Sequence, residues 1–375
     1  QAMANNPEIQ KFELQYNIAS EKVNGVNALP NTEFGVSYFV SEPETRTGAQ
    51  RFKLSVKQML PWFGTITSRE NYISSLADAT YEDIVIAKRK LITSVSQSYY
   101  NLYANTAKQK VLEENIKLLE TYETIALTSV EVGKASAVDV LRLQMRQNEM
   151  EQLLAILNQQ YLTEKTIFNK LLNRDKSISI NILSDLNFPS EDFEMNTNTL
   201  EVHPELLKYD KLYQSIETSE LLNKKESAPM IGFGLDYINV AERPNMNFSD
   251  NGKDILMPMV TVSIPIFNNS YKSKTKQNSL QQQEILAQKQ ERKNTLETFL
   301  DKAINERIAA RISYKTQTKN LKQAKNAEEI LIKNYETGTI DFNDVLDIQE
   351  LQLKFEMNQI ESIKSYFIQT TIINY

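Results

Sequence analysis

The sequence predicts a mainly α-helical protein with a small β part. Only nine glycines and ten prolines occur among the 375 residues, where average usage would supply roughly 26 glycines and 19 prolines. Two stretches, about 68–131 and 271–337, contain neither residue. Shorter runs of alternating apolar and polar residues precede both stretches, and this period is typical of strands. So few turn-forming residues leave most of the chain to very long helices.

The composition excludes several classes of function. The net charge is −6 and no block of Lys and Arg occurs, so a nucleic-acid partner is not expected. The absence of cysteine removes disulfides and thiolate chemistry. With His203 as the single histidine, a His-based metal site or a Ser-His-Asp triad has little to be built from. We therefore expect no enzyme, no cofactor and no bound metal.

The hydropathy of the chain leaves a membrane protein open. No apolar run approaches the roughly 18 residues that a membrane-spanning helix needs, but barrel strands are short and alternate, so they barely raise mean hydropathy. The chain opens at Gln1 without a signal peptide, from which we expect a processed start.

Several segments of the chain occur twice in the same order. Asn6-Pro7-Glu8 corresponds to His203-Pro204-Glu205, and Gly133 through Leu141 corresponds to Gly338 through Leu346. The separation between matched positions grows slowly along the chain, as expected for a tandem duplication with small loop insertions. We predict a first structural repeat over 1–175, a connector over 176–202 and a second repeat over 203–375.

Each repeat reads as a helix, two strands, a long helix, a turn and a second long helix. The opening helices are predicted over about 2–27 and 203–226, and each ends before a proline, which cannot continue a helix. The long helices over 68–131 and 271–337 follow the strands. At 1.5 Å per residue, sixty-odd residues reach roughly 95–100 Å, a length that a coiled coil accommodates and an ordinary globular domain does not.

The predicted strands have one apolar and one polar face. The apolar positions are Phe34, Val36, Tyr38 and Val40; Phe52, Leu54 and Val56; Ile231, Phe233, Leu235 and Tyr237; and Leu256, Val260, Val262 and Ile264. A water-soluble sheet with a core face and a membrane barrel both produce this alternation. In lipid, four strands cannot close a barrel alone and open edges are not tolerated, whereas four strands from each of three chains would close one of twelve.

Aromatic residues lie near the ends of the predicted strands. Trp62 and Phe63 follow the second strand, and Phe267 follows the fourth. Aromatic side chains gather at membrane–water boundaries, so we predict that these three residues lie at a membrane interface.

The long helices carry coiled-coil spacing. Leu112, Ile116, Leu119, Ala126 and Val130 keep a 3–4 spacing, interrupted by Glu123. From Met150 to Leu171 the same spacing recurs, with Glu164 in the gap. This pattern predicts helices packed knobs-into-holes.

At this point the chain resembles the TolC family over essentially all of its length. The resemblance is carried by Asn6-Pro7-Glu8, by Leu60-Pro61-Trp62-Phe63-Gly64 and above all by two turns, 132–141 and 335–347, which recur in register between the long helices. It implies a tandem-repeat protomer of a homotrimeric α/β barrel. Such a barrel combines four transmembrane β-strands per chain with long coiled-coil helices that extend into the periplasm.

The resemblance also implies function, location and partners. It implies an export channel in the outer membrane of a Gram-negative bacterium, surrounded by outer-membrane lipid. A periplasmic adaptor protein and an inner-membrane pump would be its partners, and the pump would supply the energy, since the chain lacks a nucleotide motif such as a P-loop. The alternative is a soluble coiled-coil scaffold without transport.

The resemblance further implies a gate at the second turn. Asp344 and Asp347 would ring the closed mouth of the trimer, and polar bonds involving Asp139 and Tyr335 would hold it shut. The basic residue that some family members place at the position of Ile340 is absent. The alternative is that these acids only cap helices: Ser136 with Asp139, and Asp341 with Asp344, have the spacing of capping boxes.

The turns themselves are predicted to meet the adaptor protein. They are the points farthest from the strands along the longest helices, and their small residues allow close approach. The residues concerned are Gly133, Lys134, Ser136, Gly338, Thr339 and Asp341.

Overall fold

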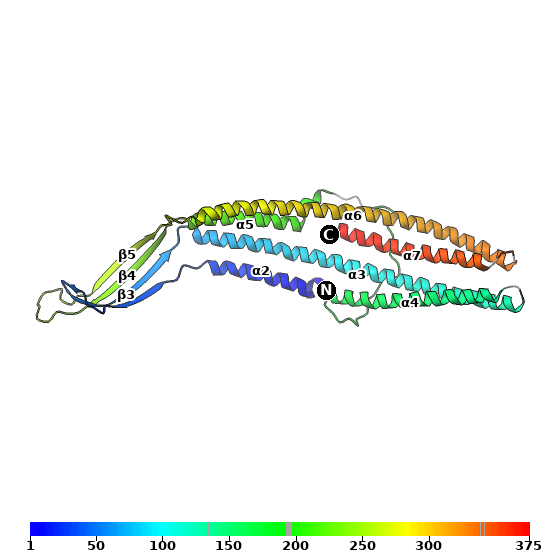
Figure 1. Cartoon of the computed structure of the whole chain (residues 1–375), viewed down its shortest axis with the longest axis horizontal. Helices are drawn as coiled ribbons and strands as arrows, with labels where there is room; N and C mark the ends of the chain where they lie inside the picture. Colours follow the sequence, from blue (N-terminus) through cyan, green and yellow to red (C-terminus); the bar gives the residue numbers. More distant parts are fainter. Residues whose placement is uncertain (134–135, 193–196, 338, 341) are drawn as a thin grey trace. The chain divides into compact units, whose positions relative to one another are not determined.

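The computed structural model describes residues 1–133, 136–192, 197–337, 339–340 and 342–375. Within them the fold is mainly helical with one small antiparallel region of sheet, as predicted (Figure 1). The helices are α1 (Ala2–Asn5), α2 (Pro7–Val26), α3 (Thr65–Glu131), α4 (Ala137–Leu171), α5 (Pro204–Glu226), α6 (Ser270–Glu336) and α7 (Phe342–Ile373), with a 3₁₀ segment over Thr197–Val202. The strands are β1 (Glu33–Tyr38), β2 (Glu44–Thr45), β3 (Gly48–Leu60), β4 (Met230–Val240) and β5 (Ile255–Ser263).

The order of elements repeats as the sequence predicts. α2, β1, β3, α3 and α4 are followed by α5, β4, β5, α6 and α7 in the same succession. α3 and α6 each contain 67 residues, which corresponds to about 100 Å of helix. In the part of the chain that the structure describes, no helix combines the length and the hydropathy needed to cross a membrane.

The chain divides into two compact units, and each takes segments from both repeats. Unit 1 comprises residues 1–10, 85–198 and 293–375, and unit 2 comprises residues 11–84 and 199–292. The long helices α3 and α6 contribute to both. Unit 2 contains the strands, and unit 1 contains α4, α7 and the part of the segment between α4 and α5 that ends at residue 198.

The sheet of unit 2 has the strand order β1-β3-β4-β5, with every neighbouring pair antiparallel. β2 was not predicted; its residues Glu44 and Thr45 pair with Ala49 and Gly48 at the start of β3. Gly48 permits this turn, because its φ is 133° and a Cβ there would lie 1.9 Å from the carbonyl oxygen of Ala241. A glycine turn thus folds a polar, non-alternating segment into a short extra strand.

The first predicted helix, over 2–27, is interrupted at Asn6. The Asn6 side chain accepts a hydrogen bond from the Glu8 amide at 2.9 Å, and it donates one to the carbonyl oxygen of Leu171 at 3.0 Å. Asn6 therefore acts as the N-cap of α2, with Pro7 at the first helical position, where its missing N–H costs nothing.

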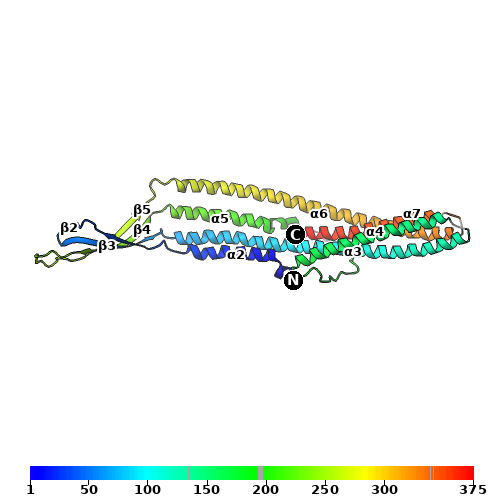
Figure 2. The same ribbon diagram turned by 60° about the horizontal axis from the view of Figure 1, so that its bottom comes forward.

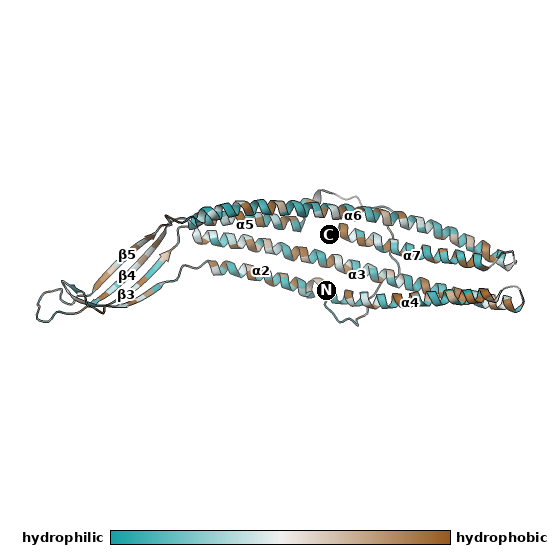
Figure 3. Cartoon of the chain, viewed as in Figure 1, coloured by the Kyte–Doolittle hydropathy of each residue, from teal (hydrophilic) through white to brown (hydrophobic). Residues whose placement is uncertain are grey.

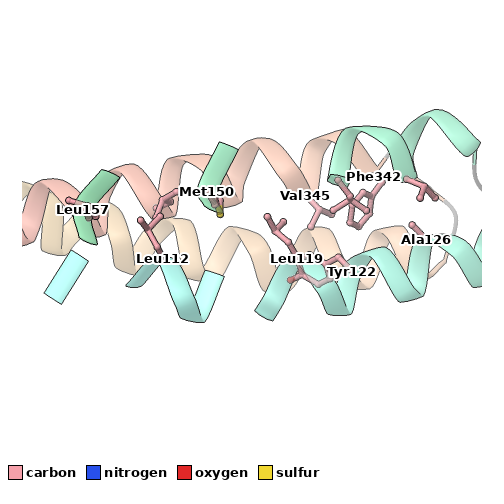
Figure 4. Packing of buried hydrophobic residues seen from close by; sticks show 11 residues of the cluster. Leu112, Leu119, Tyr122, Ala126, Met150, Leu157, Phe342 and Val345 are labelled. Carbon is pink, nitrogen blue, oxygen red and sulfur yellow. The ribbon is translucent and has the colours of Figure 1, made fainter. Parts of the chain in front are cut away.

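Four helices lie side by side in unit 1: the later parts of α3 and α6 together with α4 and α7 (Figure 2). Their core contains Leu119 and Leu143, which are fully buried, and Val345 of α7 (Figure 4). The core also holds Phe342, whose ring centroid lies 5.7 Å from that of Tyr122. The predicted 3–4 spacing therefore marks a real packing seam.

The two glutamates that interrupt this spacing have polar partners on the opposite helix. Glu123 of α3 accepts hydrogen bonds from Gln144 and Gln147 of α4, at 2.7 and 3.0 Å. Glu164 of α4 accepts one from Ser98 of α3 at 2.5 Å. Each glutamate thus links the α3–α4 pair by hydrogen bonds and does not break it.

The connector of unit 1 is fastened by Arg311 of α6. Its guanidinium binds both carboxylate oxygens of Asp192, at 2.7 and 3.2 Å, and donates to the carbonyl oxygens of Pro189 and Ser190. Tyr366 of α7 donates to the same carboxylate at 2.7 Å. We call these contacts of Arg311 and Tyr366 with the connector the clamp. Phe188, which directly precedes the residues of the clamp, stacks on Tyr314 with ring centroids 4.0 Å apart.

We expect acid to release this connector. The hydrogen bond from Arg311 is the largest of the interactions that hold the pKa of Asp192 below its usual value. A carboxyl whose pKa is lower in the folded state stabilises the fold above its unfolded pKa of about 3.9 and loses that contribution as the pH falls through the folded pKa. Limited proteolysis of the wild-type protein should therefore cut the connector faster at pH 3 than at pH 6.

Asp192→Asn should already show fast cleavage at pH 6, and its cleavage rate should change less between the two pH values. As a control, Asp175→Asn changes a carboxyl that is exposed at the other end of the connector. Equal cleavage of wild type and Asp192→Asn at pH 6 would contradict the role of the clamp.

Candidate functional site: the sheet and the helix turns

The apolar face of the sheet is uncovered in this chain. Val36, Leu54, Tyr237 and Leu256 lie side by side across the four strands, and Phe34, Val56, Leu235 and Pro258 form the next row. Phe34 is 81% exposed, Val36 79% and Val260 68%. Brown, hydrophobic residues recur along these strands in Figure 3. Because apolar side chains of a soluble sheet would be buried, this face is suited to contact with lipid.

The opposite face of the sheet is the polar one, and it includes a buried acid. Asp236 of β4 is 0% exposed, and the Nζ of Lys53 on β3 lies 2.5 Å from its Oδ2. Ser55 pairs in register with Asp236. A charged pair on the inner side and apolar residues on the outer side are the arrangement expected where lipid surrounds the sheet and water fills its concave side.

Both outer strands of the sheet have a free edge. In the described part of the chain, no strand pairs with the outer side of β1 or of β5. Each edge presents a row of backbone N–H and C=O groups that lipid cannot satisfy.

The three predicted interface residues lie just beyond one end of the sheet. Leu60 of β3 pairs with Ile231, and Ile231 pairs with Val262 of β5, so the segments that follow β3 and β5 leave the sheet at the same end. Trp62 is 38% exposed, Phe63 78% and Phe267 98%. The rings of Trp62 and Phe63 meet edge to face, with centroids 5.7 Å apart.

At one end of unit 1, the helix ends that flank the two turns lie together (Figure 1). Asp344 and Asp347 are exposed in the first two turns of α7. Their three-residue spacing places them on one helix face. Within the described residues, neither carboxylate has an ion pair.

Asp139 caps α4 in this chain. Its Oδ2 accepts a hydrogen bond from the Ser136 amide at 3.2 Å, and the Ser136 hydroxyl accepts one from the Val138 amide at 3.2 Å. The predicted capping box is therefore confirmed here. The Arg142 guanidinium lies 3.9 Å from Asp139 and also donates to the side chain of Asn343 on α7. Arg142 and Asn343 were not predicted as site residues, because they lie far apart in the chain.

Tyr335 packs against Phe342 with ring centroids 4.9 Å apart. Its hydroxyl is buried and finds no hydrogen-bond partner among the described residues. Within this chain the structure therefore does not join Tyr335 to Asp139 by a hydrogen bond. Ile340 packs on the same apolar cluster, where a basic side chain would be disfavoured.

A buried polar network lies beside this cluster and was also missed. Glu328 of α6 accepts hydrogen bonds from Tyr122 of α3 and from Gln349 and Gln352 of α7, at 3.1, 2.6 and 2.7 Å. Burial and the nearby Glu328 carboxylate raise the pKa of Tyr122. These residues tie α3 to α6 and α7.

The turn residues are partly described. Gly133 has φ 71°, a left-handed conformation that ends α3. The Thr339 hydroxyl donates to the carbonyl oxygen of Asn334 at 2.8 Å, which closes the end of α6. Gly133, Ser136 and Thr339 are exposed. Lys134, Gly338 and Asp341, which were predicted to belong to the same docking turns, lie outside the described residues.

The first half of the chain matches a known protein family. A family model described as outer membrane efflux protein matches residues 1–174. No curated protein sequence matches the chain significantly.

Solved structures resemble the whole chain. The outer-membrane channel OprN has a TM-score of 0.79 and 14% identity, over 100% of this chain and 87% of that one. The outer membrane protein VceC of Vibrio cholerae has a TM-score of 0.76 and 14% identity, over 99% and 93%. The outer membrane channel MtrE of Neisseria gonorrhoeae, described in its open state, has a TM-score of 0.77 and 15% identity, over 99% and 86%. At these identities the likeness shows the fold.

Proposed function

We propose that the chain belongs to the outer membrane efflux protein family, whose model matches residues 1–174, and that three copies assemble into one export duct. The duct crosses the outer membrane and extends into the periplasm. The single observation that carries the proposal is the uncovered apolar face of the sheet, from Phe34 to Val260. A soluble coiled-coil scaffold would not expose such an apolar face to water. Neither the family nor the structural relatives support that alternative.

The free edges of β1 and β5 support a trimer. If β5 of one chain pairs with β1 of the next, three chains place twelve strands in a closed barrel, and no edge faces lipid. Mass measurement of the detergent-solubilised protein should give three chains per particle, and the particle should form conducting pores in planar bilayers. A stable monomer that forms pores by itself would overturn the proposal.

We further propose that Asp344 and Asp347 line the closed mouth of the duct. Three chains would place six carboxylates at one constriction, and such a ring attracts cations. The Asp344→Ala/Asp347→Ala variant should therefore lose cation selectivity, together with block by multivalent cations from the periplasmic side, in single-channel recordings. Its helix stability should change by only about 0.3–1 kcal/mol per acid.

The matched control is Glu113→Gln/Glu120→Gln, which removes two exposed acids from α3. Wild-type selectivity in the double alanine variant would mean that the two aspartates only complement the helix dipole. Asp139→Ala tests the latch in the same recordings, and a raised resting conductance is expected if its cap holds the mouth in place.

The partners are proposed from the family and from the position of the turns. The turns around Gly133 and Thr339 expose small residues at one end of unit 1, which suits close contact with a periplasmic adaptor protein. The inner-membrane pump that this adaptor serves would supply the energy. The chain itself would act as a conduit without enzymatic activity.

A further inference from the structure

Five lysines gather on the helices next to the sheet. Lys224 and Lys225 lie in the last turn of α5, and Lys272, Lys274 and Lys276 lie in the first two turns of α6. Lys274 is half-buried and the other four are exposed. Within the described residues, none of the five forms an ion pair with an acid. We name this set the basic collar.

Hydrogen bonds between α5 and α6 bring the two parts of the basic collar together. Asn223 donates to the carbonyl oxygen of Tyr271 and to the Thr275 hydroxyl, both at 3.0 Å. The Nζ of Lys225 lies 3.6 Å from the position that a Cβ on Gly64 would take. Lys225 therefore lies beside the segment that joins β3 to α3, at the end of the sheet where α3, α5 and α6 meet it (Figure 1).

Two acids of α5 near the collar in sequence are already engaged. Glu220 accepts hydrogen bonds from Thr275 and Asn278, at 2.9 and 2.8 Å. Glu226 accepts two hydrogen bonds from the Arg69 guanidinium, at 2.9 and 2.8 Å. The collar is thus locally positive in a chain whose net charge is −6.

Helix stability does not account for the lysines of α6. The first turn of α6 contains no acid, and the positive end of the helix dipole disfavours cations there by typically 0.3–1 kcal/mol each. A partner that carries negative charge would reverse this cost.

The collar continues directly into an apolar surface. Trp62 and Phe63 precede α3, and Ile266 and Phe267 precede α6. Ile266 is 73% exposed and Phe267 98%. Lysine stems can lie along such an apolar surface while their ammonium groups reach the polar boundary beyond it.

We propose that the basic collar binds the phosphate groups of anionic phospholipids, in the leaflet on the helix side of the membrane. The inference rests on the proposed function, because it requires the sheet to cross a bilayer. The sheet and the aromatic residues would contact the acyl chains. Lys272 and Lys276 lie on one side of α6, and the ammonium groups of the collar that reach the lipid boundary would meet the phosphates. Attraction of this kind stabilises binding by about 1 kcal/mol per lysine near an anionic surface, roughly a fivefold change in affinity.

The test uses the full chain, assembled and reconstituted in mixed phosphatidylglycerol and phosphatidylcholine vesicles. Lipids that remain bound after gentle detergent extraction are identified by mass spectrometry of the intact assembly. The variant is Lys272→Gln/Lys274→Gln/Lys276→Gln. The control is Lys315→Gln/Lys319→Gln/Lys322→Gln, which removes the same charge from positions that begin 39 residues beyond Lys276 on α6.

Wild type and control should retain phosphatidylglycerol in preference to phosphatidylcholine. In the collar variant, the ratio of bound phosphatidylglycerol to bound phosphatidylcholine should be at least about fivefold lower. The preference should also fall as salt is added. Equal preference in collar variant and control would overturn the inference, and so would displacement of the lipid by inorganic phosphate at matched concentration, which would indicate a simple anion site. If wild type inserts without any preference, the inference fails and the proposed function stands. If no form inserts, both fail.

Discussion

Val36→Arg should lower the free energy of unfolding of the membrane-inserted protein by about 2–4 kcal/mol, the cost of an arginine on the lipid face of a transmembrane strand near the bilayer midplane. Val36 pairs with Leu54 on the neighbouring strand. Its side chain is nevertheless 79% exposed, so the rest of the chain leaves most of it uncovered. Urea titration of the protein in liposomes, followed by the heat-dependent shift in gel mobility, measures this change.

Ser37→Arg is the matched control, because Ser37 is the next residue of β1 and points to the opposite face. It should change the same free energy by less than about 1 kcal/mol, since a water-facing position tolerates charge. If the two variants are equally stable, the apolar face does not contact lipid.

Lys53→Met should destabilise the sheet by about 3–5 kcal/mol, because it leaves the carboxylate of Asp236 buried without its counter-ion. That carboxylate is fully buried, and the Lys53 ammonium lies 2.5 Å away. The same urea titration measures the loss.

Lys57→Met removes a second lysine from the same strand and the same face, but one that is exposed and has no ion pair in the described structure. It should be close to neutral. The Lys53→Met/Asp236→Leu variant should recover most of the lost stability, because it removes both charges. Equal effects of the two single lysine variants would mean that the ion pair contributes little.

The helices and strands were predictable because their signals are local. The absence of proline and glycine between Ser68 and Glu131 depends on no distant residue, and neither does the alternation around Phe34. Two features were not predicted: the interruption of the first helix and the strand β2. The cap at Asn6 and the glycine turn at Gly48 act through single hydrogen bonds and backbone angles, which hydropathy patterns do not register.

The orientation of the sheet was not predictable from its pattern. Alternation separates Val36 from Ser37 but does not say which of them meets lipid, water or a protein core. The exposure of the apolar face in the folded chain excludes a core within this chain, and the Val36→Arg and Ser37→Arg variants test whether the face meets lipid. The pairing of Lys53 with Asp236 depends on the register of β3 against β4, which joins two repeats of the sequence.

The polar contacts of unit 1 were equally hidden. Glu123 interrupts the apolar spacing of α3, and only the position of α4 reveals Gln144 as its partner. Arg142 reaches Asn343 across 201 positions of the chain. The roles of Asp344, Asp347 and Tyr335 in a gate remain predictions, as does the role of the turns in docking.

The free edges of β1 and β5 also constrain the order of events in assembly. A lone sheet in the bilayer would expose backbone groups to hydrocarbon, at several kcal/mol for each unsatisfied group. A pathway in which single chains insert first and find each other by lateral diffusion therefore passes through a state of high free energy. Chains that meet before or during insertion avoid this state. If three copies close one barrel, as proposed above, the rate-limiting step is an encounter between chains, and biogenesis should depend on the local concentration of newly delivered protein more steeply than in direct proportion.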